Sequence, residues 1–154
     1  RPSAGDMVQL AAYTGLRKGE LFRINEGHGT YRNGMLRLDA QTKTGRPRSI
    51  PVPPLVQNIC ERMPLPINNH LLRTAWEKAR KDCGMEWLHF HDLRHTYASW
   101  LVQSGAPLRA VQELLGHTTL AMTQRYSHLG SEHLLDAVSN MSAAQKQHSS
   151  NDST

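Results

Sequence analysis

The sequence predicts a mainly α domain of the α+β kind, in which helices accompany one small antiparallel β-sheet or hairpin. Apolar residues recur at helical spacing along most of the chain, whereas residues 35–40 alternate with period two. The 154 residues are enough for about one domain with a single core. With 38% hydrophobic and 20% charged residues, the composition is that of a globular protein rather than a disordered or fibrous one.

The first part of the chain is predicted to hold two helices followed by a β-hairpin. Helical spacing of apolar residues indicates helices over 4–14 and 17–24. Residues 25–34 contain three glycines and two asparagines, so they are expected to form a turn region. Residues 35–40 and 48–52 then form the two strands of the hairpin, joined by a loop that contains Gly and Pro.

The second part is predicted to be helical, with Pro, Asn and Gly residues at the helix ends. The expected helices cover residues 54–63, a stretch from Asn68 or Asn69 to just before Gly84, residues 91–104, a stretch from Pro107 to Gly116, and residues 118–127. A last amphipathic helix is indicated by an apolar stripe of Leu134, Leu135, Val138 and Met141. The three tryptophans are expected in the core: Trp76, Trp87 and Trp100.

The charge balance points to a polyanionic partner. Lys and Arg number 18 against 13 Asp and Glu, which gives a formal net charge of +5. A basic domain of this size is a candidate for nucleic-acid binding, although many basic domains are simply soluble. No apolar run approaches the roughly 18 residues of a membrane helix, and no signal peptide opens the chain. Cys60 and Cys83 are too few for a disulfide framework and fit a reducing cytoplasm.

Three stretches are more polar than ordinary amphipathic helices, and each places a cationic or titratable side chain at a helix end. His91 and Arg94 are three residues apart on one helix, so their side chains share a face near its N-terminus. Arg17 begins a helix after a Gly-containing turn, and His117 follows the glycine that ends the preceding helix. Free N–H groups and the helix dipole favour anions at helix N-termini, so these positions suit phosphate binding.

Four stretches carry these residues, in this order along the chain: TGLRKGEL, TKTGRPRSIPV, HDLRHTYAS and LLGHTTLAMTQRYSH. Together they resemble the tyrosine recombinase (phage integrase) family. The first is similar to its first arginine box and the second to the hairpin that bears its lysine. The third is similar to the box with a histidine and the second arginine, and the fourth to the segment with a further histidine and the nucleophilic tyrosine. The resemblance runs from about Leu10 to Tyr126.

The resemblance implies a clamp for the scissile phosphate. Arg17 and Arg94 would hold its non-bridging oxygens, His117 would help them, and Glu20 would support Arg17. The planar fork of arginine suits phosphate and stays charged at any working pH. Because phosphoryl transfer needs mainly positioning and charge stabilisation, no metal and no other cofactor is expected.

The resemblance also assigns the nucleophile and the proton transfers. Tyr126 matches the nucleophile that forms a covalent 3′-phosphotyrosine, His91 would handle its proton, and Lys43 would protonate the leaving 5′ oxygen. The covalent intermediate keeps the energy of the phosphodiester. The expected function is therefore cleavage and rejoining of DNA by a site-specific recombinase or integrase of a mobile element, rather than hydrolysis.

By the same resemblance, residues 1–141 would form the catalytic domain and residues 142–154 a tail, which lacks core-forming side chains and is expected to be disordered. The family's helical core-binding domain is expected outside this chain, since few residues precede the first catalytic helix. The expected partners are double-stranded DNA and further copies of the chain, as a tetramer on DNA. The stripe from Leu134 to Met141 would dock on a neighbouring copy or pack on its own domain. The protein would be cytoplasmic and DNA-associated, in a bacterial cell or phage host, with no membrane partner.

Other interpretations stay open at this stage. Residues 107–126 could form a helix-turn-helix DNA reader without catalysis, and type IB topoisomerases share the tyrosine chemistry. His91 and His95 could hold zinc, although no Cys or carboxylate at ligand spacing completes the set; otherwise His95 would make a structural hydrogen bond. Taken alone, Arg17 and Lys43 would be ordinary surface charges.

Overall fold

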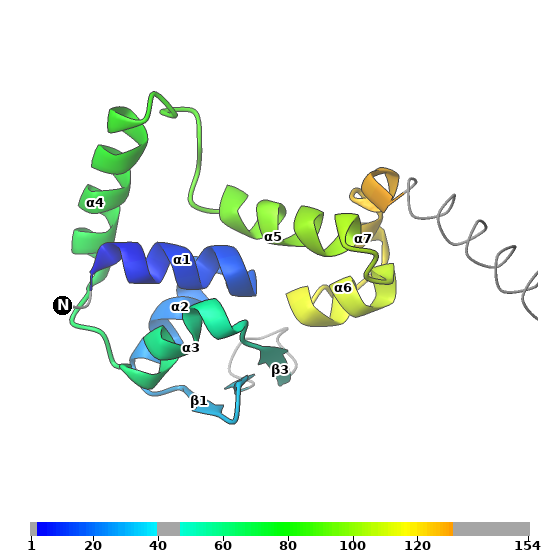
Figure 1. Ribbon diagram of the computed structural model, residues 1–154, viewed down its shortest axis with the longest axis horizontal. Coiled ribbons are helices and arrows are strands. Elements are labelled where there is room, and N and C mark those ends of the chain that lie inside the picture. Colours follow the sequence, from blue (N-terminus) through cyan, green and yellow to red (C-terminus); the bar gives the residue numbers. More distant parts are fainter. Residues whose placement is uncertain (1–2, 40–46, 131–154) are drawn as a thin grey trace, which may run out of the picture.

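Helices make up most of the computed structural model, which describes residues 3–39 and 47–130 (Figure 1). The mainly α prediction with one small antiparallel sheet is therefore confirmed. The elements are α1 Ala4–Thr14, α2 Lys18–Asn25, β1 Gly29–Arg32, β2 Met35–Leu38, β3 Arg48–Pro51, α3 Pro54–Glu61, α4 Asn69–Asp82, α5 Asp92–Gln103, α6 Leu108–Leu115, α7 Ala121–Gln124 and the 3₁₀ helix η1 Ser127–Gly130. Within the described residues, no helix is long and apolar enough to cross a membrane.

The sheet has three antiparallel strands in the order β1-β2-β3. Leu36 of β2 pairs with Ile50 of β3, and both side chains are fully buried, so the hairpin predicted from the alternating pattern is confirmed. The sequence prediction was wrong in assigning all of residues 25–34 to a turn, because β1 lies within them. Asn33 and Gly34 turn the chain tightly with φ values of 51° and 74°, which suits a two-residue hairpin loop.

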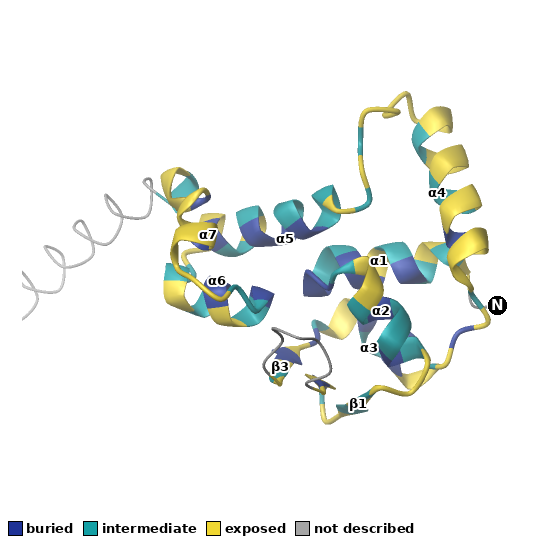
Figure 2. Ribbon diagram, turned by 180° about the vertical axis from the view of Figure 1, so that it is seen from behind, coloured by how far each residue is buried: buried dark blue, intermediate teal, exposed yellow. Residues whose placement is uncertain are grey.

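The core consists of two clusters of buried side chains. The larger lies between α1, α2, α3, α4 and the sheet, and includes Met7, Leu10, Leu21, Leu36 and Ile50. The smaller joins α5 and α6 to the segment after α7, and consists of Tyr97, Ala98, Val102, Val111, Leu115 and Tyr126. Figures 1 and 2 show α5 leading from the first group of elements, where it lies beside α1, to the second. The two parts therefore meet where the ends of α1 and α6 approach α5.

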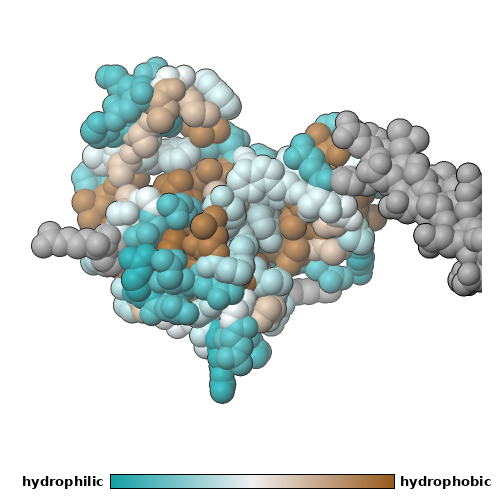
Figure 3. All heavy atoms as spheres, viewed as in Figure 1, coloured by the Kyte–Doolittle hydropathy of each residue, from teal (hydrophilic) through white to brown (hydrophobic). Residues whose placement is uncertain are grey.

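The tryptophan prediction was wrong for two of the three residues. Trp87 is 68% exposed and Trp100 is 45% exposed, while Trp76 is half-buried with its ring edge against Phe90. Among the described residues α4 buries only Leu72, and Figure 2 shows most of this helix as exposed. In the space-filling view, hydrophobic side chains are visible beside α4 and across the middle of the face (Figure 3).

The helix predicted over 118–127 is also shorter than expected, because only α7 and η1 form there. A helix-turn-helix reader over 107–126 needs a second helix that can lie in the major groove, and the four residues of α7 are too short for that. Lys43, the Leu134–Met141 stripe and the tail over 142–154 lie outside the described residues.

Gly15 and Gly84 provide a matched test of the packing between α1 and α5. Both have φ 66°, but a Cβ on Gly15 would lie 2.4 Å from Cδ1 of Tyr97, whereas a Cβ on Gly84 would meet nothing within 4 Å. We expect Gly84→Ala to lower the free energy of unfolding by about 1–2 kcal/mol through backbone strain alone. Gly15→Ala should lower the free energy of unfolding by about 1–3 kcal/mol more, because its Cβ clashes with Tyr97. Urea unfolding measures both losses, and equal losses would contradict this account.

Candidate active site

Arg94, on α5, joins the ends of two other helices. Its side chain is 3% exposed, and its Nη1 and Nη2 donate to the carbonyl oxygens of Gly15 at 2.7 Å and Leu115 at 2.5 Å. These carbonyls lie at the C-terminal ends of α1 and α6, neither of which has a basic residue in its last turn. Arg94 therefore supplies the cation that both helix dipoles favour. Burial, with the nearby charge of Arg17, lowers its pKa to about 10, so it stays cationic at neutral pH.

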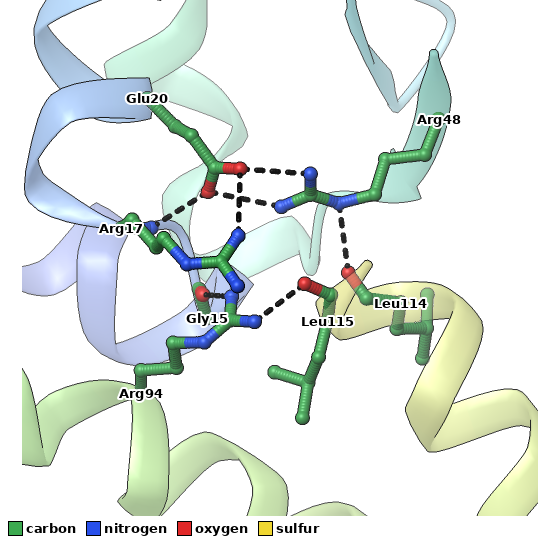
Figure 4. Close-up of polar contacts among 7 residues, drawn as sticks. All are labelled: Gly15, Arg17, Glu20, Arg48, Arg94, Leu114 and Leu115. Atoms are coloured by element: carbon green, nitrogen blue, oxygen red, sulfur yellow. Dashed lines mark hydrogen bonds and ion pairs between the residues drawn. The ribbon is translucent and has the colours of Figure 1, made fainter. Parts of the chain in front are cut away.

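Arg48, on β3, makes a second connection between the two parts of the fold. It forms a two-pronged ion pair with Glu20 of α2, with Nη1–Oε1 at 2.8 Å and Nη2–Oε2 at 2.9 Å. Its Nε donates to the carbonyl of Leu114 at the end of α6, at 3.2 Å. A Cβ on Gly116 would lie 2.9 Å from Nη1 of Arg48, so the glycine gives the guanidinium room to lie there. Figure 4 shows these groups converging between α2, β3 and α6.

Glu20 also contacts Arg17, as the resemblance implied, but Arg48 is its stronger partner. Oε2 accepts the backbone N–H of Arg17 at 2.8 Å, and Oε1 lies 3.4 Å from Nη1 of the same residue. Burial alone would raise the pKa of Glu20, but the hydrogen bonds and charges of Arg48 and Arg17 outweigh it, and the net effect lowers the pKa. The ionised carboxylate thus holds two guanidinium groups together, and the Arg17 side chain keeps 42% of its surface exposed.

His117 lies just beyond α6, on the wall of an open hollow that is also lined by Arg17, Glu20 and Arg48. Its Nδ1 is 2.8 Å from Oγ1 of Thr123, which fixes the ring. Burial, followed by the positive charges of Arg94 and Arg17, lowers the pKa of His117 to about 4, so the ring is neutral at pH 7. Arg94 is not part of the lining and lies buried beside the hollow.

Tyr126 is 7% exposed in the smaller cluster, and its hydroxyl is hydrogen-bonded to Nδ1 of His95. Burial raises the pKa of Tyr126, although the charges of Arg125 and Arg94 oppose this. The ring of His91 meets that of His95 edge-on, with centroids 5.1 Å apart. Burial, together with the neighbouring His95 and Arg94, lowers the pKa of His91.

The structure therefore brings five of the six predicted catalytic side chains into one region around Arg94, whose charge acts on three of the others. The five are Arg17, His91, Arg94, His117 and Tyr126, and the sixth, Lys43, lies outside the described residues. Sequence reasoning missed the part played by Arg48, and it expected a structural hydrogen bond for His95 without naming Tyr126 as the partner. Within the described ranges, no group of three or more His, Cys, Asp and Glu side chains could hold a metal ion.

Comparisons with known proteins give matches to integrases and recombinases. The model of the phage integrase family matches residues 59–133. The integrase of Salmonella phage P22 is 44% identical over 84 residues, which are 51% of this chain and 22% of that protein. A shufflon-specific DNA recombinase of Escherichia coli is 30% identical over 149 residues, 92% of this chain and 38% of the relative. The catalytic domain of bacteriophage HP1 integrase superposes with a TM-score of 0.70 at 26% identity, covering 88% of this chain and 80% of that one.

The chain matches the phage integrase family over residues 59–133. Its fold is that of the tyrosine recombinase catalytic domain, as the HP1 match shows over most of both chains. The chain spans 22% and 38% of the two sequence relatives, so those proteins contain more than this domain.

Replacement of Arg94 tests its structural part in this integrase fold. Arg94→Ala leaves two buried helix-end carbonyls without their donor, so we expect the free energy of unfolding to fall by about 2–5 kcal/mol. Arg94→Lys can reach one of the two carbonyls and should lose about 1–3 kcal/mol. Arg73→Ala, at a residue whose side chain is 74% exposed, is the control and should stay within about 0.5 kcal/mol. Chemical denaturation measures these losses. If Arg94→Ala lost no more free energy of unfolding than this control, the structural role of Arg94 would be contradicted.

Proposed function

We propose that the chain is the catalytic domain, over residues 1–141, of a site-specific DNA recombinase or integrase. It cleaves and rejoins strands of double-stranded DNA through a covalent 3′-phosphotyrosine at Tyr126, without a metal ion or another cofactor. The observation that carries this proposal is the gathering of Arg17 and His117 around Arg94, whose charge also acts on the phenol of Tyr126.

The phosphate is held by the side chains around the hollow. Arg17 has an exposed guanidinium there, and His117, neutral at pH 7, can donate one ring N–H to a non-bridging oxygen. Arg94 uses two of its five N–H groups on the helix carbonyls, which leaves others for the phosphate. The dense positive charge stabilises the negative charge that builds up on the equatorial oxygens during transfer.

The nucleophile and the leaving group both need proton transfer. Since burial raises the pKa of Tyr126, its proton must pass to a neighbouring base as the oxygen attacks. His91 lies one helical turn before His95, whose ring is hydrogen-bonded to the phenol. Lys43 acts as the acid that protonates the leaving 5′ oxygen.

The remaining parts of the proposal concern the whole protein. The relatives are longer than this chain, so a core-binding domain in the rest of the protein supplies much of the DNA affinity and the choice of site. Four copies assemble on DNA. The Leu134–Met141 stripe docks on a neighbouring copy or packs on its own domain, and residues 142–154 follow as a tail. The protein works on DNA in the cytoplasm of a bacterium or phage host.

The experiment is to trap the covalent adduct on nicked duplex DNA with a randomised stretch around the nick. We expect the chain, or the full-length protein, to form an adduct that resists denaturing gel electrophoresis and that Tyr126→Phe abolishes. Tyr97→Phe is the matched control, because Tyr97 is an equally buried tyrosine of the same cluster, and it should keep the adduct. An adduct that survives Tyr126→Phe, or none from the full-length protein, would refute the proposal. Relaxation of supercoiled plasmid without site preference would instead favour a topoisomerase.

A further inference from the structure

The phenol of Tyr126 is held by a histidine to which the resemblance gives no catalytic part. Its hydroxyl is hydrogen-bonded to Nδ1 of His95, and no other partner of that hydroxyl occurs in residues 3–39 and 47–130. His91 is exposed at the start of α5, whereas His95 is half-buried one turn further along. The base nearest to the nucleophilic oxygen is therefore His95.

The side chains around Tyr126 and His95 hold the two rings in place and exclude most of the solvent. Tyr126 packs in the cluster formed by α5 and α6, with Tyr97 and Leu115 among its members. The ring of His95 also makes an edge-on contact with the ring of His91. A neutral imidazole whose Nε2 carries the hydrogen presents Nδ1 as an acceptor, which is the form that can take up a proton from a phenol.

We propose that His95 is a catalytic residue that accepts the proton of Tyr126 during DNA cleavage. As Oη of Tyr126 forms its bond to phosphorus, the phenolic proton passes to Nδ1 of His95 and the bond from phosphorus to the 5′ oxygen breaks. The leaving oxygen takes its proton from the acid assigned above to Lys43. Rejoining returns the proton from His95 to the phenol. This inference rests on the proposed function and transfers to His95 the proton-handling part that the resemblance gives to His91.

Two substitutions separate proton acceptance from simple positioning. Asn places Oδ1 near the position of Nδ1, so His95→Asn keeps a hydrogen-bond acceptor but cannot take a proton at neutral pH. His95→Phe removes both abilities. We expect the single-turnover rate of adduct formation on nicked DNA to fall about 100-fold or more in both variants, as for loss of a general base. His89→Asn, at a histidine just before α5 whose side chain is 79% exposed, is the control and should keep the wild-type rate.

A second DNA probe separates the nucleophile's proton from the leaving group's proton. Sulfur in place of the bridging 5′ oxygen leaves as a thiolate, which needs no acid. This DNA should restore the rate of Lys43→Ala but leave His95→Asn slow. Rescue of His95→Asn to the same extent as Lys43→Ala would overturn the inference, because it would place His95 at the leaving group.

The contact itself is measurable without DNA. In ¹⁵N spectra of the histidine rings, Tyr126→Phe should shift Nδ1 of His95, and thermal melting checks that each variant is folded. An unchanged Nδ1 signal, or a wild-type adduct rate in His95→Asn, overturns the inference alone. Failure of the wild-type protein to form any adduct overturns the proposed function, and this inference with it.

Discussion

The buried guanidinium of Arg94 is the interaction on which the rest of the site depends. Taking a cation out of water is costly unless hydrogen bonds and opposite charge compensate it. Here the compensation comes from the carbonyl ends of α1 and α6, so the same contacts that make the burial tolerable also fix the two helices on α5. The orientation of the guanidinium is thus set by backbone atoms, which move less than side chains.

The ion pair between Glu20 and Arg48 solves a related problem. Three arginines close together repel one another, and a single carboxylate between them offsets part of that repulsion. Because Arg48 also donates to Leu114, the pair ties α2, β3 and α6 together around the hollow. The site keeps a net positive charge and can attract a phosphodiester. Burial, followed by the same positive charges, lowers the pKa of His117 and keeps its ring neutral.

Much of this fold could be predicted because its signals are local. Helix ends at Gly15 and Gly116 follow from the left-handed backbone that glycine adopts, and the β2–β3 hairpin follows from the alternation of Leu36 and Leu38. Strand β1 was missed because the turn residues around it dominate its short sequence. Trp87 and Trp100 were misplaced because tryptophan's size alone does not say which helix face has a neighbour.

The candidate site could be predicted only where the family boxes name a residue. The partnership of Arg48 with Glu20 joins positions 28 apart, and that of Arg94 with Gly15 joins positions 79 apart, so neither has a local pattern. The sequence predicts a structural hydrogen bond for His95 but not its partner, because the direction of the ring depends on how α5 meets the segment that carries Tyr126. Such contacts are properties of the tertiary fold.

The most direct measurement is a crystal structure of the chain soaked with tungstate, a tetrahedral anion whose position anomalous scattering reveals. The account predicts one anion between Arg17 and His117, within hydrogen-bonding reach of Arg94 and facing the hydroxyl of Tyr126. An anion bound elsewhere, with these guanidinium and imidazole groups turned away from one another, would contradict it.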